Sequence, residues 1–174
     1  MLQADMPRLL PWKAHRDERG AFKEEYVEGQ HPQIVGPVHQ LSTVRSRWGV
    51  VRGLHYNALG KQWKQMFAVI GTHWAVAVDV RKDSPTAGAW VSTYLDEGKA
   101  AFWVPPGFAS GLLCLSDGGV AMYLSNVGGD PVNARSLGVF SDVNVRWPIL
   151  PEVLVANERD RACMTLKEFW SSYD

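Results

Sequence analysis

The residues best suited to chemistry lie in one short segment, Val50-Val51-Arg52-Gly53-Leu54-His55-Tyr56. The segment combines a guanidinium, which can bind an anion, with an imidazole, which can exchange a proton near neutral pH. Side chains alternate along a strand, so residues three apart normally face opposite sides. A bulge at Gly53 would turn Arg52 and His55 toward the same side. The pattern therefore predicts an anion-binding group and a general base in one cavity. The alternative is a solvated strand end with an incidental histidine.

These residues need a rigid scaffold to position them, and the sequence pattern predicts that this scaffold consists mainly of strands. Short runs of strand-forming residues alternate with turn signals such as Asp-Glu-Arg-Gly and Pro-Pro-Gly. The predicted strands are 21–26, 38–44, 49–55, 64–71, 73–79, 89–95, 100–104, 109–115 and 120–125. The nearly all-apolar run 73–80 predicts a central strand buried on both faces. Turns at this spacing predict an all-β sandwich or barrel.

One helix is predicted, near the C-terminal end. Thr165 is a suitable N-cap for residues 166–172, and Glu168 at the third helical position completes a capping box. A shorter helical turn is expected near residues 148–153.

Composition narrows the class of protein. The 174 residues suffice for one domain with a real core, and we expect a single domain over 1–174. The 18 acidic and 18 basic side chains balance, whereas nucleic-acid binders usually have a basic excess. No apolar run approaches the roughly 20 residues that span a bilayer, and the first residues lack the pattern of a secretory signal.

Cysteine and tryptophan usage adds two expectations. The two cysteines, Cys114 and Cys163, form no CxxC pair and predict a reduced, cytoplasmic protein with buried thiols. The eight tryptophans are expected mainly in a β core or at a subunit interface.

A series of motifs along the chain resembles the dTDP-4-dehydrorhamnose 3,5-epimerase family, a branch of the cupin-like β-barrels, over about residues 12–150. The matching elements follow the family order: His15-x-Asp17-x-Arg19-Gly20-x-Phe22-x-Glu24, Gln40, Val51-Arg52-Gly53-Leu54-His55-Tyr56, Gln62-x-Lys64, Val78-Asp79-Val80-Arg81 with Ser84-Pro85, Val104-Pro105-Pro106-Gly107-Phe108-Ala109, Tyr123, Asp142 and Trp147-Pro148.

The resemblance implies a double-stranded β-helix (a cupin-like jelly roll), usually a homodimer, with the active site inside the barrel. The family acts on nucleotide-diphosphate 4-keto-6-deoxysugars, most often linked to deoxythymidine, for polysaccharides or glycosylated natural products. It removes a proton alpha to the ketone and returns one to the opposite face, without a metal or an organic cofactor.

The resemblance also implies three catalytic roles. His55 would be the base, because enolisation needs a proton acceptor near neutral pH. Asp142 would orient its imidazole, as a triad aspartate does. Lys64 would hydrogen-bond the oxyanion that develops at the sugar C4. Taken singly, a lysine such as Lys64 on a strand is more often a solvated edge lysine, and an aspartate such as Asp142 is more often a turn residue.

Five further residues would bind the nucleotide sugar. Arg19 and Arg52 would hold the diphosphate or sugar, since a planar guanidinium fits phosphate oxygens. Phe22 and Glu24 would contact the nucleoside or sugar, and Gln40 would line the pocket.

The chain departs from the family pattern at four places. Ser110 replaces a histidine after the Pro-x-Gly-Phe-Ala run, and Ser42 replaces an asparagine. Gly129 falls where the resemblance puts the family's tyrosine acid, so the second proton would come from water or from Tyr56 or Tyr123. The segment that follows Asp142 is also shorter than usual.

These departures leave several functions open. The chain is predicted to be a 3,5-epimerase-like isomerase, a single-centre epimerase, a keto-sugar tautomerase or isomerase, or a degenerate homologue that binds a sugar nucleotide. A metal-dependent cupin is disfavoured, because such sites converge two or three histidines and the five histidines include no His-x-His pair.

Overall fold

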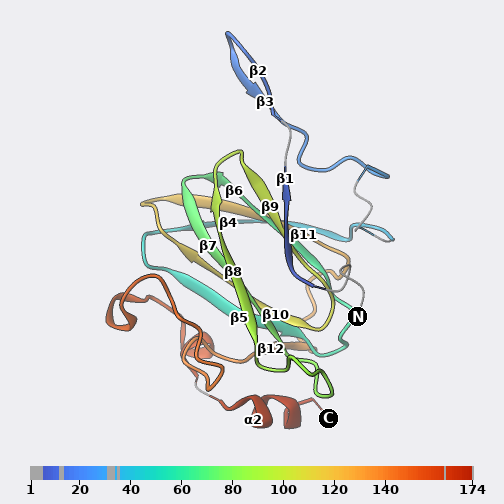
Figure 1. The fold of residues 1–174 in the computed structure, drawn as a ribbon, viewed down its shortest axis with the longest axis vertical. Coiled ribbons are helices and arrows are strands. Elements are labelled where there is room, and N and C mark those ends of the chain that lie inside the picture. The colour runs from blue at the N-terminus through green and yellow to red at the C-terminus, as the bar shows by residue number, and fades with distance from the viewer. Residues whose placement is uncertain (1–5, 12–13, 31–33, 35, 163, 174) are drawn as a thin grey trace.

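The computed structural model describes residues 6–11, 14–30, 34, 36–162 and 164–173. Two five-stranded antiparallel sheets face each other, and a separate two-stranded hairpin extends away from them (Figure 1). The first sheet has the order β1 (Arg8–Pro11), β9 (Ala100–Val104), β6 (Lys64–Ile70), β11 (Gly119–Ser125) and β4 (Gln40–Ser46). The second has the order β12 (Ala134–Ser136), β5 (Val51–Asn57), β10 (Phe108–Cys114), β7 (Thr72–Asp79) and β8 (Trp90–Asp96).

The arrangement is the cupin-like jelly roll that the resemblance implies, so the predicted fold class is confirmed. All nine predicted strands form, most with ends shifted by one or two residues, although the first shrinks to β3 (Gly20–Phe22). Three short strands were not predicted: β1, β12 and β2 (His15–Asp17). Each has only three or four residues, too few for side-chain alternation to be recognisable.

Apolar side chains fill three layers around the two sheets. One cluster lies between the sheets and includes Met66, Ala77 and Phe102. A second packs the outer face of the second sheet against the C-terminal segment, and a third covers the outer face of the first sheet. Strand β7 contributes to the first two clusters and lies between β10 and β8, which confirms the doubly buried central strand.

Several tryptophans and one thiol lie in these layers. Trp63, Trp74 and Trp103 are buried as expected, whereas Trp48 is exposed. Cys114 is a buried free thiol, while Cys163 lies outside the described residues.

The C-terminal helix α2 (Leu166–Ser171) has the predicted capping box between Thr165 and Glu168. The expected helical turn appears as the short 3-10 helix η2 (Pro151–Val153), and a further helix, α1 (Glu158–Arg161), was not predicted. Among the described residues, no helix is long and apolar enough to cross a membrane.

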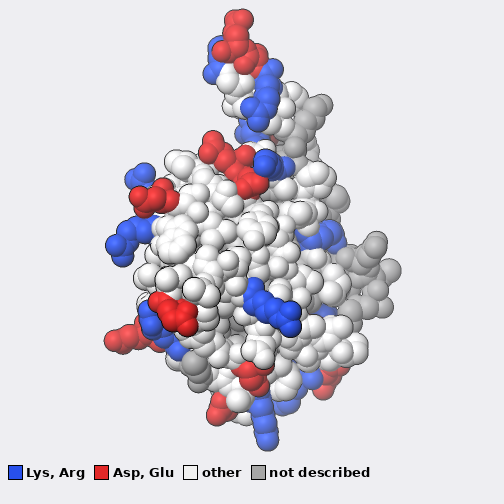
Figure 2. Space-filling model, turned by 60° about the vertical axis from the view of Figure 1, so that its left-hand side comes forward, with Lys and Arg blue, Asp and Glu red and all other residues white. Residues whose placement is uncertain are grey.

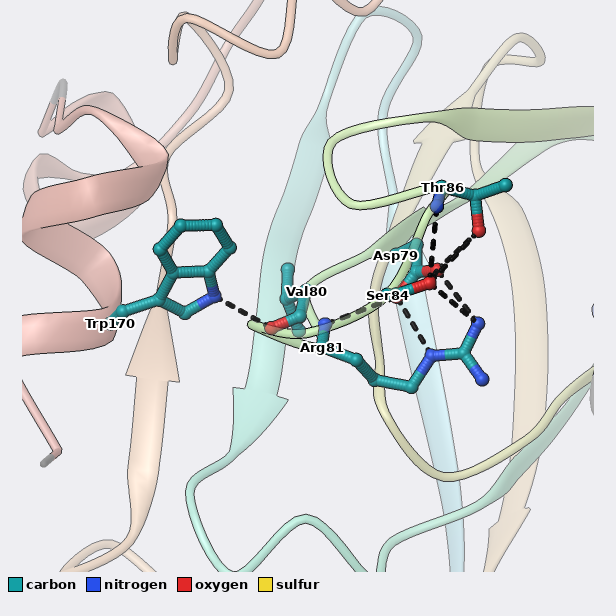
Figure 3. A network of polar contacts seen from close by, with 6 residues as sticks. All are labelled: Asp79, Val80, Arg81, Ser84, Thr86 and Trp170. Atoms are coloured by element: carbon teal, nitrogen blue, oxygen red, sulfur yellow. Dashed lines mark hydrogen bonds and ion pairs between the residues drawn. The ribbon is translucent and has the colours of Figure 1, made fainter.

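A polar network at the end of β7 supports the C-terminal helix (Figure 3). The Asp79 carboxylate accepts hydrogen bonds from Arg81, Ser84 and Thr86 at 2.6–2.9 Å. The indole nitrogen of Trp170 donates to the carbonyl of Val80 at 2.7 Å. The network therefore ties the turn after β7 to α2.

The β2–β3 hairpin stands clear of both sheets (Figure 1), and all of its residues are exposed. On the face shown in Figure 2, acidic and basic side chains alternate on the hairpin and are sparse over the body. This face carries no extended patch of one sign.

Candidate active site

The bulge that the sequence predicts at Gly53 is present. The pairing of β10 with β5 shifts between Ser110 and Leu112, and Gly53 has a φ of 133°. A Cβ atom at Gly53 would lie 2.7 Å from the Gly111 Cα atom, so only glycine fits. The bulge lets Arg52 and His55 line the same pocket, which is the placement that the sequence predicts for these two side chains.

His55 is paired with a carboxylate from α1. Its Nε2 atom lies 2.8 Å from Oδ1 of Asp160, a residue that is only 1% exposed. Asp160 also accepts hydrogen bonds from the backbone of Gly53 and the hydroxyl of Ser136. Burial alone would raise the pKa of Asp160, but these hydrogen bonds, His55 first, hold it below its usual value. The carboxylate therefore remains ionised beside the imidazole.

The structure corrects the expected role of Asp142. Its Oδ1 atom accepts a hydrogen bond at 2.8 Å from the backbone N–H of Leu166, at the start of α2, and the residue is exposed. Asp142 is therefore committed to a helix terminus, and Asp160 is the carboxylate that contacts His55. The prediction was wrong because the contact joins β5 to α1, 105 residues further along the chain, and no local pattern marks it.

Lys64 enters the pocket from β6, in the opposite sheet. Its Nζ atom donates to the hydroxyl of Ser110 at 3.1 Å, and burial lowers the pKa of the ammonium to about 8. Ser110, which replaces the family's histidine, thus still provides a partner for Lys64. The lysine is a pocket residue and not a solvated edge lysine.

Tyr123 lies on the same wall as Lys64, on the neighbouring strand β11. Its hydroxyl has no hydrogen-bond partner within the described part of the chain. The pocket therefore has the His55–Asp160 pair on one wall, and an ammonium and a phenol on the other.

The pocket has two lobes that share His55, Lys64 and Tyr123. The arginine lobe is lined additionally by Val44, Arg52, Met66, Ser110, Gly111, Leu112, Asn157 and Asp160. The glycine lobe is lined additionally by Gln40, Tyr56, Asn57, Gln62, Gly128, Gly129, Asp130, Ala134 and Arg159.

The predicted binding residues fall into two groups. Arg52 lies in the arginine lobe and Gln40 in the glycine lobe. Arg19 and Phe22 lie on the hairpin and Glu24 directly after it, and none of them lines either lobe. Phe22 is 64% exposed, an unusual state for a large aromatic side chain.

Sequence reasoning missed Asp160 and Arg159 and left Tyr123 without a firm role. Asp160 follows Asn157, whose side-chain oxygen caps α1 by accepting from the Asp160 N–H at 2.7 Å. An Asn three residues before an acidic residue is a helix-start signal that could have marked this segment. Its place 105 residues after His55 gave no local sign of the contact.

Among the residues that the structure describes, no group of three His, Cys, Asp or Glu side chains is arranged to hold a metal ion.

The fold and pocket together define a jelly-roll protein with an acid–base site between its sheets. Comparison with known proteins gives the same class. The family model for dTDP-4-dehydrorhamnose 3,5-epimerase matches residues 7–168, which extends the resemblance beyond residue 150 and includes Asp160. The chain belongs to this family.

Individual relatives agree. The dTDP-4-dehydrorhamnose 3,5-epimerase of Shigella flexneri is 35% identical over 158 residues, covering 86% of this chain and 87% of the relative. A 3,5-epimerase from Legionella pneumophila, solved with dTDP-4-keto-L-rhamnose, is 31% identical with a TM-score of 0.90, covering 99% of this chain and 94% of the other.

A 3'-monoepimerase from Streptomyces bikiniensis is similar as well. Its structure with dTDP, in a variant with one histidine and one tyrosine replaced, is 25% identical with a TM-score of 0.84. It covers 99% of this chain and 95% of its own.

Proposed function

We propose that this single-domain protein epimerises nucleotide-diphosphate 4-keto-6-deoxysugars, with dTDP as the nucleotide. The observation that carries the proposal is the 2.8 Å contact between His55 and Asp160 on one wall of a pocket whose other wall holds Lys64 and Tyr123. A base and a hydrogen-bond donor on opposite sides of one cavity are what enolisation of a ketone requires.

In the first step, His55 removes the proton from a carbon next to the C4 ketone. Asp160 fixes the imidazole and stabilises the imidazolium that forms. The electron pair of the broken C–H bond moves into the ring and leaves an enolate, with its negative charge on the C4 oxygen. The Lys64 ammonium hydrogen-bonds that oxygen, and the interaction strengthens as the charge develops.

In the second step, a proton returns to the same carbon from the opposite face. The Tyr123 hydroxyl is suited to this transfer because it lies on the wall facing His55 and its hydrogen-bonding capacity is uncommitted. Inversion therefore does not need a tyrosine at position 129. The solved 3'-monoepimerase variant likewise has one histidine and one tyrosine replaced.

The working unit is proposed to be a homodimer. Arg19, Phe22 and Glu24 match the family's substrate-binding residues, yet they lie on or beside a hairpin that extends away from its own barrel (Figure 1). A second copy related by a two-fold axis would bring each hairpin to its partner's pocket. We place this enzyme in the cytoplasm, in keeping with the buried free thiol of Cys114.

Proton NMR in D₂O with dTDP-4-keto-6-deoxyglucose tests the proposal. The wild-type protein should replace the C3 or C5 proton, or both, with deuterium and form the inverted product. The His55→Ala variant should do neither. Loss of only one signal would identify a single-centre epimerase, and an isomerised ketone would identify a tautomerase. Binding without any exchange would overturn the proposal in favour of a non-catalytic homologue.

A further inference from the structure

Two glycines, Gly128 and Gly129, line the glycine lobe, although the backbone at both positions could carry a side chain. A Cβ atom built on Gly128 or Gly129 meets nothing within 4 Å, and neither residue has a left-handed φ. Other glycines of the chain are needed for a positive φ or a close approach, as Gly53 is. Gly128 is half-buried and Gly129 is exposed, so the pair borders the lobe without side chains and leaves it open.

The loop that bounds this space is held in place by its own hydrogen bonds. The Asp130 carboxylate accepts from the side chains of Asn57 at 3.1 Å and Asn133 at 2.9 Å. The backbone of Ala58 also donates to the carbonyl of Asn133 at 2.8 Å. Because the loop is tied to the end of β5, the space is a built part of the pocket.

The lining of the lobe offers both acceptors and a donor. Hydrogen bonds from Asn133 and then Asn57 lower the pKa of Asp130, so the carboxylate stays ionised. The side-chain nitrogen of Gln62 is engaged with Ser125, which leaves its amide oxygen to accept. The Arg159 guanidinium supplies the donors. A neutral group with one N–H and one carbonyl complements this set.

We propose that the glycine lobe receives an N-acylamino group carried at C2 or C3 of the 4-keto sugar. The N–H would donate to the oxygens of Asp130 or Gln62, and the carbonyl would accept from Arg159. A hydroxyl at the same carbon has a single oxygen, whereas an N-acylamino group presents its donor and its acceptor on separate atoms. This inference rests on the proposed function and narrows its substrate class to acylamino 4-keto-6-deoxysugars.

The test compares substrates that differ only at this position. Exchange kinetics in D₂O are measured with dTDP-4-keto-6-deoxyglucose and with its 2-acetamido and 3-acetamido analogues. For one analogue, we expect kcat/KM to exceed that of the parent by about tenfold or more. In Gly129→Tyr, which adds a large side chain to the lining of the lobe, that ratio should fall by at least about tenfold. Val132→Tyr, which adds the same side chain to an exposed site of the same loop, should leave the ratio unchanged.

Each outcome decides one of the two proposals. A wild-type ratio at or below one for both analogues, or a ratio that Gly129→Tyr does not change, overturns the acylamino assignment and leaves the epimerase intact. Absence of His55-dependent exchange with all three compounds overturns the epimerase itself.

Discussion

The acid–base chemistry depends on single atoms, above all on the carboxylate that contacts His55. We expect Asp160→Asn to lower kcat by about a thousandfold or more, because an amide can neither stabilise the imidazolium nor fix the same tautomer. Deuterium exchange and epimerised product are the measurements. Asp142→Asn is the matched control and should keep near wild-type turnover, since Asp142 binds the start of α2 and lines neither lobe of the pocket. A comparable loss of turnover in Asp142→Asn would restore Asp142 as the catalytic carboxylate.

The polar network in the turn after β7 helps to hold helix α2 in place. The stability that this network gives the folded protein should depend on pH. Burial opposes ionisation of Asp79, but hydrogen bonds from Arg81, Ser84 and Thr86 lower its pKa to about 2 (Figure 3). A lowered folded-state pKa adds stability above the unfolded value near 4, worth about 2 kcal/mol, which is lost as the pH falls toward 2. Urea unfolding at pH 7 and pH 3 should show about half of this loss, because pH 3 lies between the folded and unfolded pKa values.

Asp79→Asn provides the comparison. We expect it to cost about 3 kcal/mol or more at pH 7, because Arg81 loses its buried ionic partner. It should also lose less further stability on acidification than the wild type does. Asp117→Asn removes a carboxylate at an exposed turn and should behave like the wild type. Equal acid sensitivity in wild type and Asp79→Asn would contradict the assignment.

At the scale of the whole molecule, the question is whether the β2–β3 hairpin binds substrate at the pocket of its own subunit or at the pocket of its partner. If the hairpin acts on its partner's pocket, mixing His55→Ala with Arg19→Ala should create a dimer with one fully wild-type site. Random exchange of subunits then restores about a quarter of the wild-type sites. Turnover is measured before and after co-refolding, with each variant refolded alone as the control. Mixed dimers no more active than the Arg19→Ala variant would show that each hairpin serves its own barrel.

Sequence patterns were reliable wherever the signal is local. Apolar runs and turn residues predicted the strands, and Thr165 with Glu168 predicted the start of α2. Gly53 predicted the bulge that aligns Arg52 with His55, because the backbone conformation of a glycine position is a short-range property. The family resemblance then identified Lys64 and Gln40 as pocket residues.

Contacts between distant segments were decided only by the tertiary structure. Asp160 reaches His55 because α1 packs beside β5, and Tyr123 faces His55 because the two sheets enclose one cavity. No periodic pattern in the sequence marks either contact. Hydrophobic patterning shows which side of a strand is buried but not which residue lies across from it. The same limit explains why Asp142 was expected beside His55, although it binds the start of α2. The sequence by itself determined the elements and the reactive residue types, and the packing of the two sheets determined which of them meet.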